Sequence, residues 1–141
     1  MVRKICCLIY RNHKIKGVQY LLLRKKLNWE GWEFVKGEVG EGEALIDAVI
    51  REVKQETGLH TRIIGIEPFT YSYDYLKGLD FIESNVACFL AEAKSNEVFL
   101  SEEHSHHKWM DYEDALKMID FEGPKAFLQM VNQRLSSKII H

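Results

Sequence analysis

Residues 37–59, with the sequence GEVGEGEALIDAVIREVKQETGL, decide how the rest of this chain is interpreted. Residues 43–57 are predicted to form an α-helix, because apolar side chains recur there at helical spacing and Gly58 is well placed to end it. With about 100° between successive residues, four apolar side chains share one face of that helix. This face should pack on a β-sheet, and it contains Leu45, Ala48, Val49 and Val53.

Two acidic side chains, Glu52 and Glu56, lie on the same helix face as these apolar residues. Asp47, Arg51 and Lys54 point to the opposite side. Carboxylates at positions i and i+4 repel each other, and partial burial would raise both pKa values unless a cation compensates. Because carboxylate oxygens are natural ligands of Mg²⁺, the helix predicts a candidate hard-metal site. The alternative is that both acids lie at the edge of the apolar face and reach water.

The loop before the helix contains Gly37, Gly40 and Gly42, which allow the backbone to approach a ligand closely. Lys36 adds a positive charge beside this loop. An ordinary turn is the structural alternative for the three glycines. Next to the acids of the helix, however, the loop strengthens the prediction of a ligand site.

The remaining chain is predicted to form strands, followed by two closing helices. Strands are expected at residues 3–10, 18–24, 32–35, 62–73, 85–93 and 107–110. A hairpin loop at 11–17 joins the first two, and the third lies in a loop that spans 28–42. Asp111 is expected to cap a helix that runs through Ile119, and Pro124 suits the first turn of the last helix. This pattern predicts an α/β sandwich with a mixed sheet.

The composition is that of a soluble globular protein with one domain, residues 1–141. A formal net charge of -2 argues against binding of duplex DNA, but a nucleotide could still bind if a metal ion met its charge. The apolar run that ends at Tyr10 is too short to span a membrane. Cys6, Cys7 and Cys88 lie in apolar runs and are expected to be reduced core thiols, which favours a cytoplasmic location. No exposed apolar stripe stands apart from the expected core, so the sequence leaves the oligomeric state open, with a monomer as the expectation.

Residues 37–59 resemble the Nudix box, whose pattern is G-x5-E-x7-R-E-U-x-E-E-x-G-U, with U a bulky apolar residue. The matching positions are Gly37, Glu43, Arg51, Glu52, Val53, Glu56, Gly58 and Leu59. The resemblance implies a Nudix-type α/β/α sandwich and hydrolysis of a nucleoside diphosphate linked to another group, with Mg²⁺ or Mn²⁺. It also implies that Glu52 and Glu56 are metal ligands, with the Gly37 carbonyl as a third. Glu43 would pair with Arg51 and hold the loop onto the helix. Gln55 replaces the first of two adjacent glutamates, so the number of metal ions stays open.

The flanking sequence resembles one branch of this superfamily, the asymmetrically cleaving diadenosine tetraphosphate hydrolases. The similar stretches are residues 32–37, 100–104, 108–109 and 114–115, followed by Phe121 and the final helix. By that resemblance, Glu103 faces the metals as a further ligand or as the base that activates water. A solvated acid in a charged loop is the alternative. His104, together with His106 and His107, would contact phosphate or form a surface cluster.

Two aromatic rings sandwich an adenine in that branch, and Tyr75 and Phe121 fall near the corresponding places. Tyr71 and Tyr73 are the alternatives to Tyr75. Stacking on a base contributes roughly 1–3 kcal/mol and tolerates different bases.

Lys36 and Arg24 would help to hold the phosphates of such a substrate, although each could be an ordinary surface base. The basic residues that the resemblance leads us to expect after the first tyrosine are reduced to Lys77, with Glu83 and Ser84 nearby. A long polyphosphate would be less well neutralised there.

The preferred mechanism is in-line attack of a metal-activated water on a phosphorus of the polyphosphate chain. With diadenosine tetraphosphate the products would be ATP and AMP. One alternative is a pyrophosphohydrolase that acts on nucleoside triphosphates or on RNA 5′ ends, with the same box and a different outer pocket. Another is a catalytically silent module that senses a nucleotide.

Overall fold

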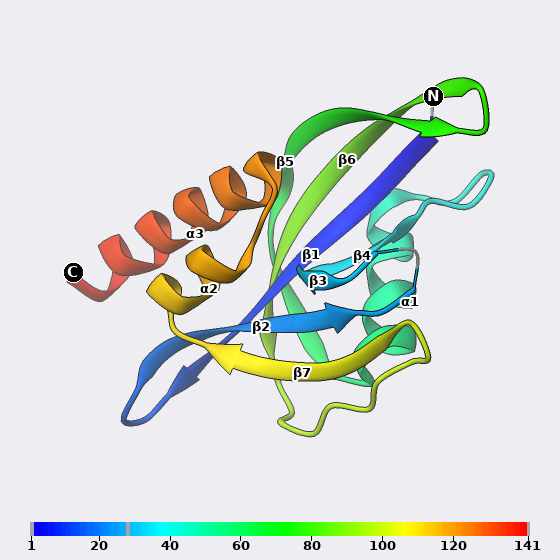
Figure 1. The fold of residues 1–141 in the computed structure, drawn as a ribbon. Helices are drawn as coiled ribbons and strands as arrows, with labels where there is room; N and C mark the ends of the chain where they lie inside the picture. The colour runs from blue at the N-terminus through cyan, green and yellow to red at the C-terminus, as the bar shows by residue number, and fades with distance from the viewer. Residues whose placement is uncertain (1, 28, 141) are drawn as a thin grey trace.

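The computed structural model describes residues 2–27 and 29–140, which fold into one mixed β-sheet with helices on both faces (Figure 1). The strand order is β3-β2-β1-β6-β5, with β4 paired to β1 and β7 paired to β2. The strands are β1 (Val2–His13), β2 (Gly17–Lys25), β3 (Gly31–Glu33), β4 (Val35–Glu38), β5 (Thr61–Lys77), β6 (Asp80–Ala93) and β7 (His104–Met110). Helix α1 (Leu45–Thr57) covers one face, and α2 (Tyr112–Met118) and α3 (Glu122–Ile140) cover the other. The predicted α/β/α sandwich is confirmed.

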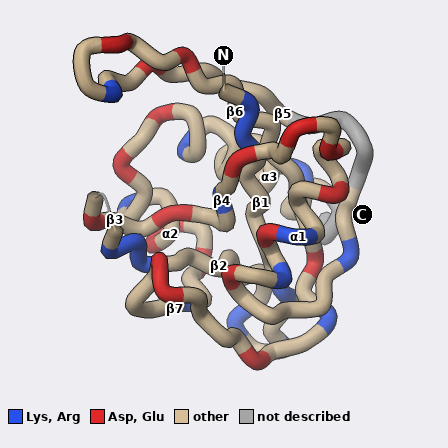
Figure 2. The backbone as a smooth tube through the Cα atoms, turned by 90° about the vertical axis from the view of Figure 1, so that its right-hand side faces the viewer, with Lys and Arg blue, Asp and Glu red and all other residues tan. Residues whose placement is uncertain are grey.

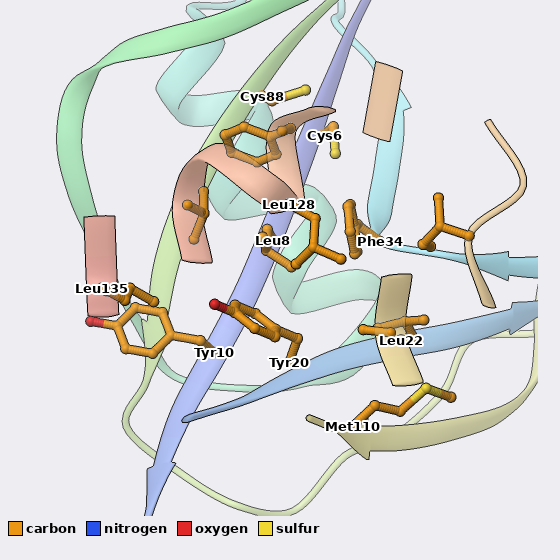
Figure 3. Packing of buried hydrophobic residues seen from close by; sticks show 14 of the residues in the cluster. Cys6, Leu8, Tyr10, Tyr20, Leu22, Phe34, Cys88, Met110, Leu128 and Leu135 are labelled. Carbon is orange, nitrogen blue, oxygen red and sulfur yellow. The ribbon is translucent and has the colours of Figure 1, made fainter. Parts of the chain in front are cut away.

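Each face of the sheet has its own apolar core. The apolar face predicted for α1 packs as expected, with Ala48, Val49 and Val53 buried and Leu45 partly buried against them. The core under α2 and α3 contains Leu8, Tyr20, Leu22 and Leu128, among others (Figure 3). There the Tyr20 hydroxyl donates to Asn132 Oδ1 at 2.8 Å, so the polar end of this buried side chain has a hydrogen-bond partner.

The sheet forks beside β1. Strand β1 pairs with β4 over positions 4–7 but with β2 only over positions 10–13. Strands β3 and β7 stay with β2, on the other branch of the fork. On its opposite edge β1 runs parallel to β6 along most of its length. Strands β4 and β3 therefore lie on separate branches of one sheet, and α1 packs against β4 and β1.

Helix α1 ends as predicted, with Gly58 in the left-handed region at φ 68° and its N–H bonded to the Lys54 carbonyl. Its first residue is Leu45, two positions later than expected, because Glu43 is held in the preceding loop by Arg51. Helix α2 also follows the prediction. The Asp111 side chain accepts from the Asp114 N–H at 2.9 Å and caps the first turn.

Three strand predictions need correction. The strands of the first hairpin extend into the predicted loop, which leaves only residues 14–16 in the turn. The strand expected around 32–35 is two strands, because β3 pairs with β2 and β4 pairs with β1. Strands β5 and β6 continue to Lys77 and from Asp80, and they form a long hairpin that projects from the molecule (Figure 2). Residue 28 of the predicted 28–42 loop lies outside the described residues.

The three cysteines, Cys6, Cys7 and Cys88, are free and buried, as expected for core thiols. In the described part of the chain, no helix combines the length and the apolar character needed to cross a membrane.

Candidate active site

Glu56 is a buried acid on the sheet-facing side of α1, with 4% of its surface exposed. Burial, followed by repulsion from Glu52 and other nearby acids, raises the pKa of Glu56 to about 9. One carboxylate oxygen of Glu103 lies within 4.8 Å of one of Glu56, so the two acids face each other across the site. The Glu56 Oε2 atom has no hydrogen-bond partner among the described residues. An acid in this position is stabilised by a proton or by a cation.

Glu52 lies one helical turn before Glu56 and against the backbone of Gly37 on β4. A Cβ atom at Gly37 would overlap the Glu52 carboxyl group, so no larger residue fits unless this carboxylate moves. The close approach brings the Gly37 backbone to the face of α1 that carries both acids. The structure therefore brings Gly37 into contact with Glu52.

The loop is held to the helix by Arg51. Its Nε and Nη2 atoms donate to the two Glu43 carboxylate oxygens at 2.9 and 3.0 Å. The same guanidinium donates to Glu52 Oε1 at 2.6 Å and to the Glu38 carbonyl at 2.9 Å. Glu43 also accepts from the Gly40 N–H at 2.8 Å. The hydrogen bond from Arg51, followed by that from Gly40, lowers the pKa of Glu43 to about 2. The Arg51 guanidinium group therefore orients Glu52 as well as the loop.

His104 lies inside the site, against Glu33, and its contact with a phosphate stays a prediction. Its side chain is fully buried, and its Nε2 atom lies 2.8 Å from Glu33 Oε2. Its Nδ1 atom finds no partner among the described residues. His106 and His107 are exposed, so the surface alternative holds for them alone. Sequence reasoning missed Glu33, because nothing local distinguishes this acid from others in the chain.

The donor set fits a hard divalent cation. Ligand atoms of Glu56, Glu103 and His104 lie within 4.8 Å of one another, and Glu52 and the Gly37 backbone are adjacent along α1 and β4. Most of these donors are oxygens, as Mg²⁺ and Mn²⁺ prefer. Glu56 Oε2 is buried and available. Gln55 is exposed, away from the buried face of α1.

The two rings expected to bind a base, Tyr75 and Phe121, have different surroundings. The Lys4 ammonium group lies over the Tyr75 ring, 5.0 Å from its centroid, and the Tyr73 ring lies beside it. Phe121 is 57% exposed and meets Trp29 edge to face at 5.5 Å. Tyr71 packs against Gly123 of α3, where it is partly buried against the core under that helix.

The predicted phosphate-binding bases are distributed around this region. Lys36, one position before Gly37, donates to the Tyr73 hydroxyl at 3.0 Å. Arg24 lies over the Trp32 ring and 3.8 Å from Glu30. Lys77 is exposed at the end of the β5–β6 hairpin, far along that hairpin from Tyr73.

Comparison with known proteins gives consistent matches. The NUDIX domain model matches residues 2–130. The asymmetrical bis(5′-nucleosyl)-tetraphosphatase of Rattus norvegicus is 32% identical over 97% of this chain and 98% of its own length. The protein of the same name from Caenorhabditis elegans is 31% identical over 86% of this chain and 87% of its own length. The crystal structure of a C. elegans Ap4A hydrolase binary complex superposes with a TM-score of 0.82 and 28% identity, and it covers 97% of this chain and 99% of that one.

Proposed function

This chain belongs to the Nudix family, and we propose that it hydrolyses diadenosine tetraphosphate to ATP and AMP with Mg²⁺ or Mn²⁺. The observation that carries the proposal is the buried Glu56 carboxyl group, whose free oxygen faces a set of metal-type donors. The substrate assignment is supported by the similarity to proteins named asymmetrical bis(5′-nucleosyl)-tetraphosphatases along nearly the whole chain.

Glu52, Glu56, Glu103 and the Gly37 carbonyl would hold the metal. When bound, the metal would neutralise charge on the phosphate oxygens and lower the pKa of a nearby water. Glu103 is half-exposed, with Lys25 Nζ 3.5 Å from its Oε2, so it can reach both solvent and the buried Glu56. We assign it the proton of the attacking water, accepted at a carboxylate oxygen. Arg51 and Glu43 would act by positioning Glu52 and the loop.

The base would stack on Tyr75, with Phe121, the residue before α3, on its other face. Each ring has another aromatic neighbour, Tyr73 for Tyr75 and Trp29 for Phe121. Lys36 and Arg24 would contact phosphates on the way to the metal. Lys77 lies at the hairpin end and would contribute only to a long substrate.

A substrate panel tests the function. Diadenosine tetraphosphate, the four common nucleoside triphosphates and a 5′-triphosphate RNA would be compared with Mg²⁺ and with Mn²⁺, and the products separated by ion-exchange chromatography. Equal amounts of ATP and AMP are expected from the dinucleotide, with the highest kcat/KM of the panel. Two molecules of ADP, or faster turnover of the triphosphates, would contradict the proposed substrate. No turnover of any compound, despite tight nucleotide binding, would favour the catalytically silent module that senses a nucleotide.

Glu43→Gln is expected to lower kcat/KM by roughly 10- to 100-fold, because residues that orient a metal ligand have effects of that size. The amide replaces a carboxylate that receives two hydrogen bonds from Arg51. Arg51 would then be free to shift and take Glu52 with it. Initial rates at several Mg²⁺ concentrations would measure the effect, which should include a higher Mg²⁺ requirement. Glu41→Gln, an exposed position in the same loop, is the matched control, and equal rates for the two variants would refute the positioning role.

A further inference from the structure

Two ammonium groups converge on one phenol oxygen beside the candidate active site. The Tyr73 hydroxyl accepts from Lys4 Nζ at 2.8 Å and from Lys36 Nζ at 3.0 Å. The two lysines come from β1 and β4, and Tyr73 comes from β5, so three strands build this group. The separation of the two ammonium nitrogens cannot exceed the sum of those two distances.

No carboxylate of the described residues forms an ion pair with either lysine, whereas Arg24, Lys25 and Arg51 all have acidic partners. The partial compensation that exists comes from aromatic faces. Lys4 lies 5.2 Å from the Tyr73 ring and Lys36 lies 4.5 Å from it. Two neighbouring positive charges without a counter-charge repel each other, and an anion placed between them relieves that repulsion.

The group also has unused hydrogen-bond donors. Tyr73 accepts two hydrogen bonds and still carries its own O–H proton, and each ammonium group has further N–H bonds. Although burial raises the pKa of Tyr73, the hydrogen bonds from Lys36 and Lys4 outweigh it, and the net pKa is lowered. All three side chains are half-buried, so their donors remain within reach of a ligand. Several donors from one small area suit the oxygens of a phosphate chain.

The position of the group agrees with this use. Lys36 directly precedes Gly37, whose backbone contacts Glu52, and Lys4 reaches the Tyr75 ring on the other side. The group thus links the proposed metal position to the proposed base. The β5–β6 hairpin beyond it carries only one basic residue, Lys77, with Asp80 and Glu83. Lys4 on β1 provides the positive charge that this hairpin lacks.

We propose that Lys4, Tyr73 and Lys36 form the subsite that binds the polyphosphate chain of the substrate, with Lys4 as a specificity residue and Tyr73 as the residue that positions both lysines. The inference rests on the proposed function for the identity of the substrate, but the anion site itself does not require hydrolysis.

Binding of inorganic tripolyphosphate, measured by titration calorimetry in EDTA at low ionic strength, tests the subsite without turnover. Lys4→Met is expected to raise the Kd by about tenfold, the effect of one charge-assisted hydrogen bond. Lys14→Met is the matched control, since Lys14 is exposed in the turn at the far end of β1. Lys4→Gln serves as a second neutral variant if the Met variant fails to fold, and Lys4→Arg should recover part of the affinity.

Tyr73→Phe should also weaken tripolyphosphate binding. Combined with Lys4→Met, it should raise the Kd by less than the product of the two single effects, because both changes disrupt one arrangement. If the Kd of the double variant rose by the full product of the two single effects, the two residues would act independently and Tyr73 would not position Lys4. A wild-type protein that does not bind tripolyphosphate, or equal Kd values for the Lys4 and Lys14 variants, would overturn the subsite. Failure of the substrate panel alone would overturn only the proposed function.

Discussion

Glu56→Gln is expected to lower kcat/KM for diadenosine tetraphosphate by at least about a thousandfold, because residues that merely orient a metal ligand already account for roughly 10- to 100-fold. The amide keeps the size of the side chain but removes the charge. Its buried position offers no neighbouring group that could take over, since Glu103 is already part of the same set of donors. Initial rates at saturating Mg²⁺ and the far-ultraviolet circular dichroism spectrum would be measured together.

Asp47→Asn is the matched control for this variant. Asp47 is exposed on the opposite side of α1, so its replacement removes one carboxylate from the same helix without touching the site. A rate within about twofold of the wild type is expected, as for most surface substitutions. Retention of more than a tenth of the wild-type activity by a folded Glu56→Gln protein would refute the ligand role.

The same Glu56→Gln change is expected to stabilise the metal-free protein at alkaline pH, by up to about 6 kcal/mol. The pKa of Glu56 is about 9 in the folded state, against an ordinary value of 4.5. Between these values the folded protein retains a proton that the unfolded chain has lost. The contribution of Glu56 is therefore complete below pH 4.5 and is lost as pH rises toward 9. Glutamine does not titrate, so the variant escapes this loss.

Urea unfolding in EDTA at pH 5, 7 and 9 would measure the difference. The free energies of unfolding of the wild type and the variant should be similar at pH 5 and should diverge as pH rises. Saturating Mg²⁺ should narrow the difference at high pH, since the wild type gains more of the binding free energy of the metal than the variant does. The Asp47→Asn protein should follow the wild-type pH dependence. If the free energies of unfolding of Glu56→Gln and the wild type changed in parallel with pH, Glu56 would ionise at its ordinary pKa.

Local sequence patterns predicted the parts of the site that lie on one element. Helical spacing placed Glu52 and Glu56 on one face of α1, and Gly58 marked the end of that helix. The steric need for Gly37 agrees with its place in the same segment. These features depend on residues a few positions apart, and the regular geometry of a helix carries them directly into space.

The contacts that join distant strands could not be predicted in this way. Lys4 and Tyr73 are 69 positions apart, and they meet because β1, β6 and β5 are neighbours in a particular register. A shift of one residue in either pairing would turn one of these side chains to the other face of the sheet. Glu33 and His104 likewise meet only because β3 and β7 both join β2. No repeating pattern of residue types within one element specifies which distant strands pair.

The parallel pairing of β1 with β6 determines the order in which the protein can assemble during synthesis. β1 emerges well before β6, and Val2 must wait for Ser84 before its pairing can begin. Strand β2 and strand β4 are available earlier, so one edge of β1 can be closed while the other stays open. Such distant pairings slow folding, and an open apolar edge promotes aggregation. A nascent chain stalled before Asp80 would therefore be a substrate for chaperones, and the Lys4–Tyr73 contact would be among the last to form.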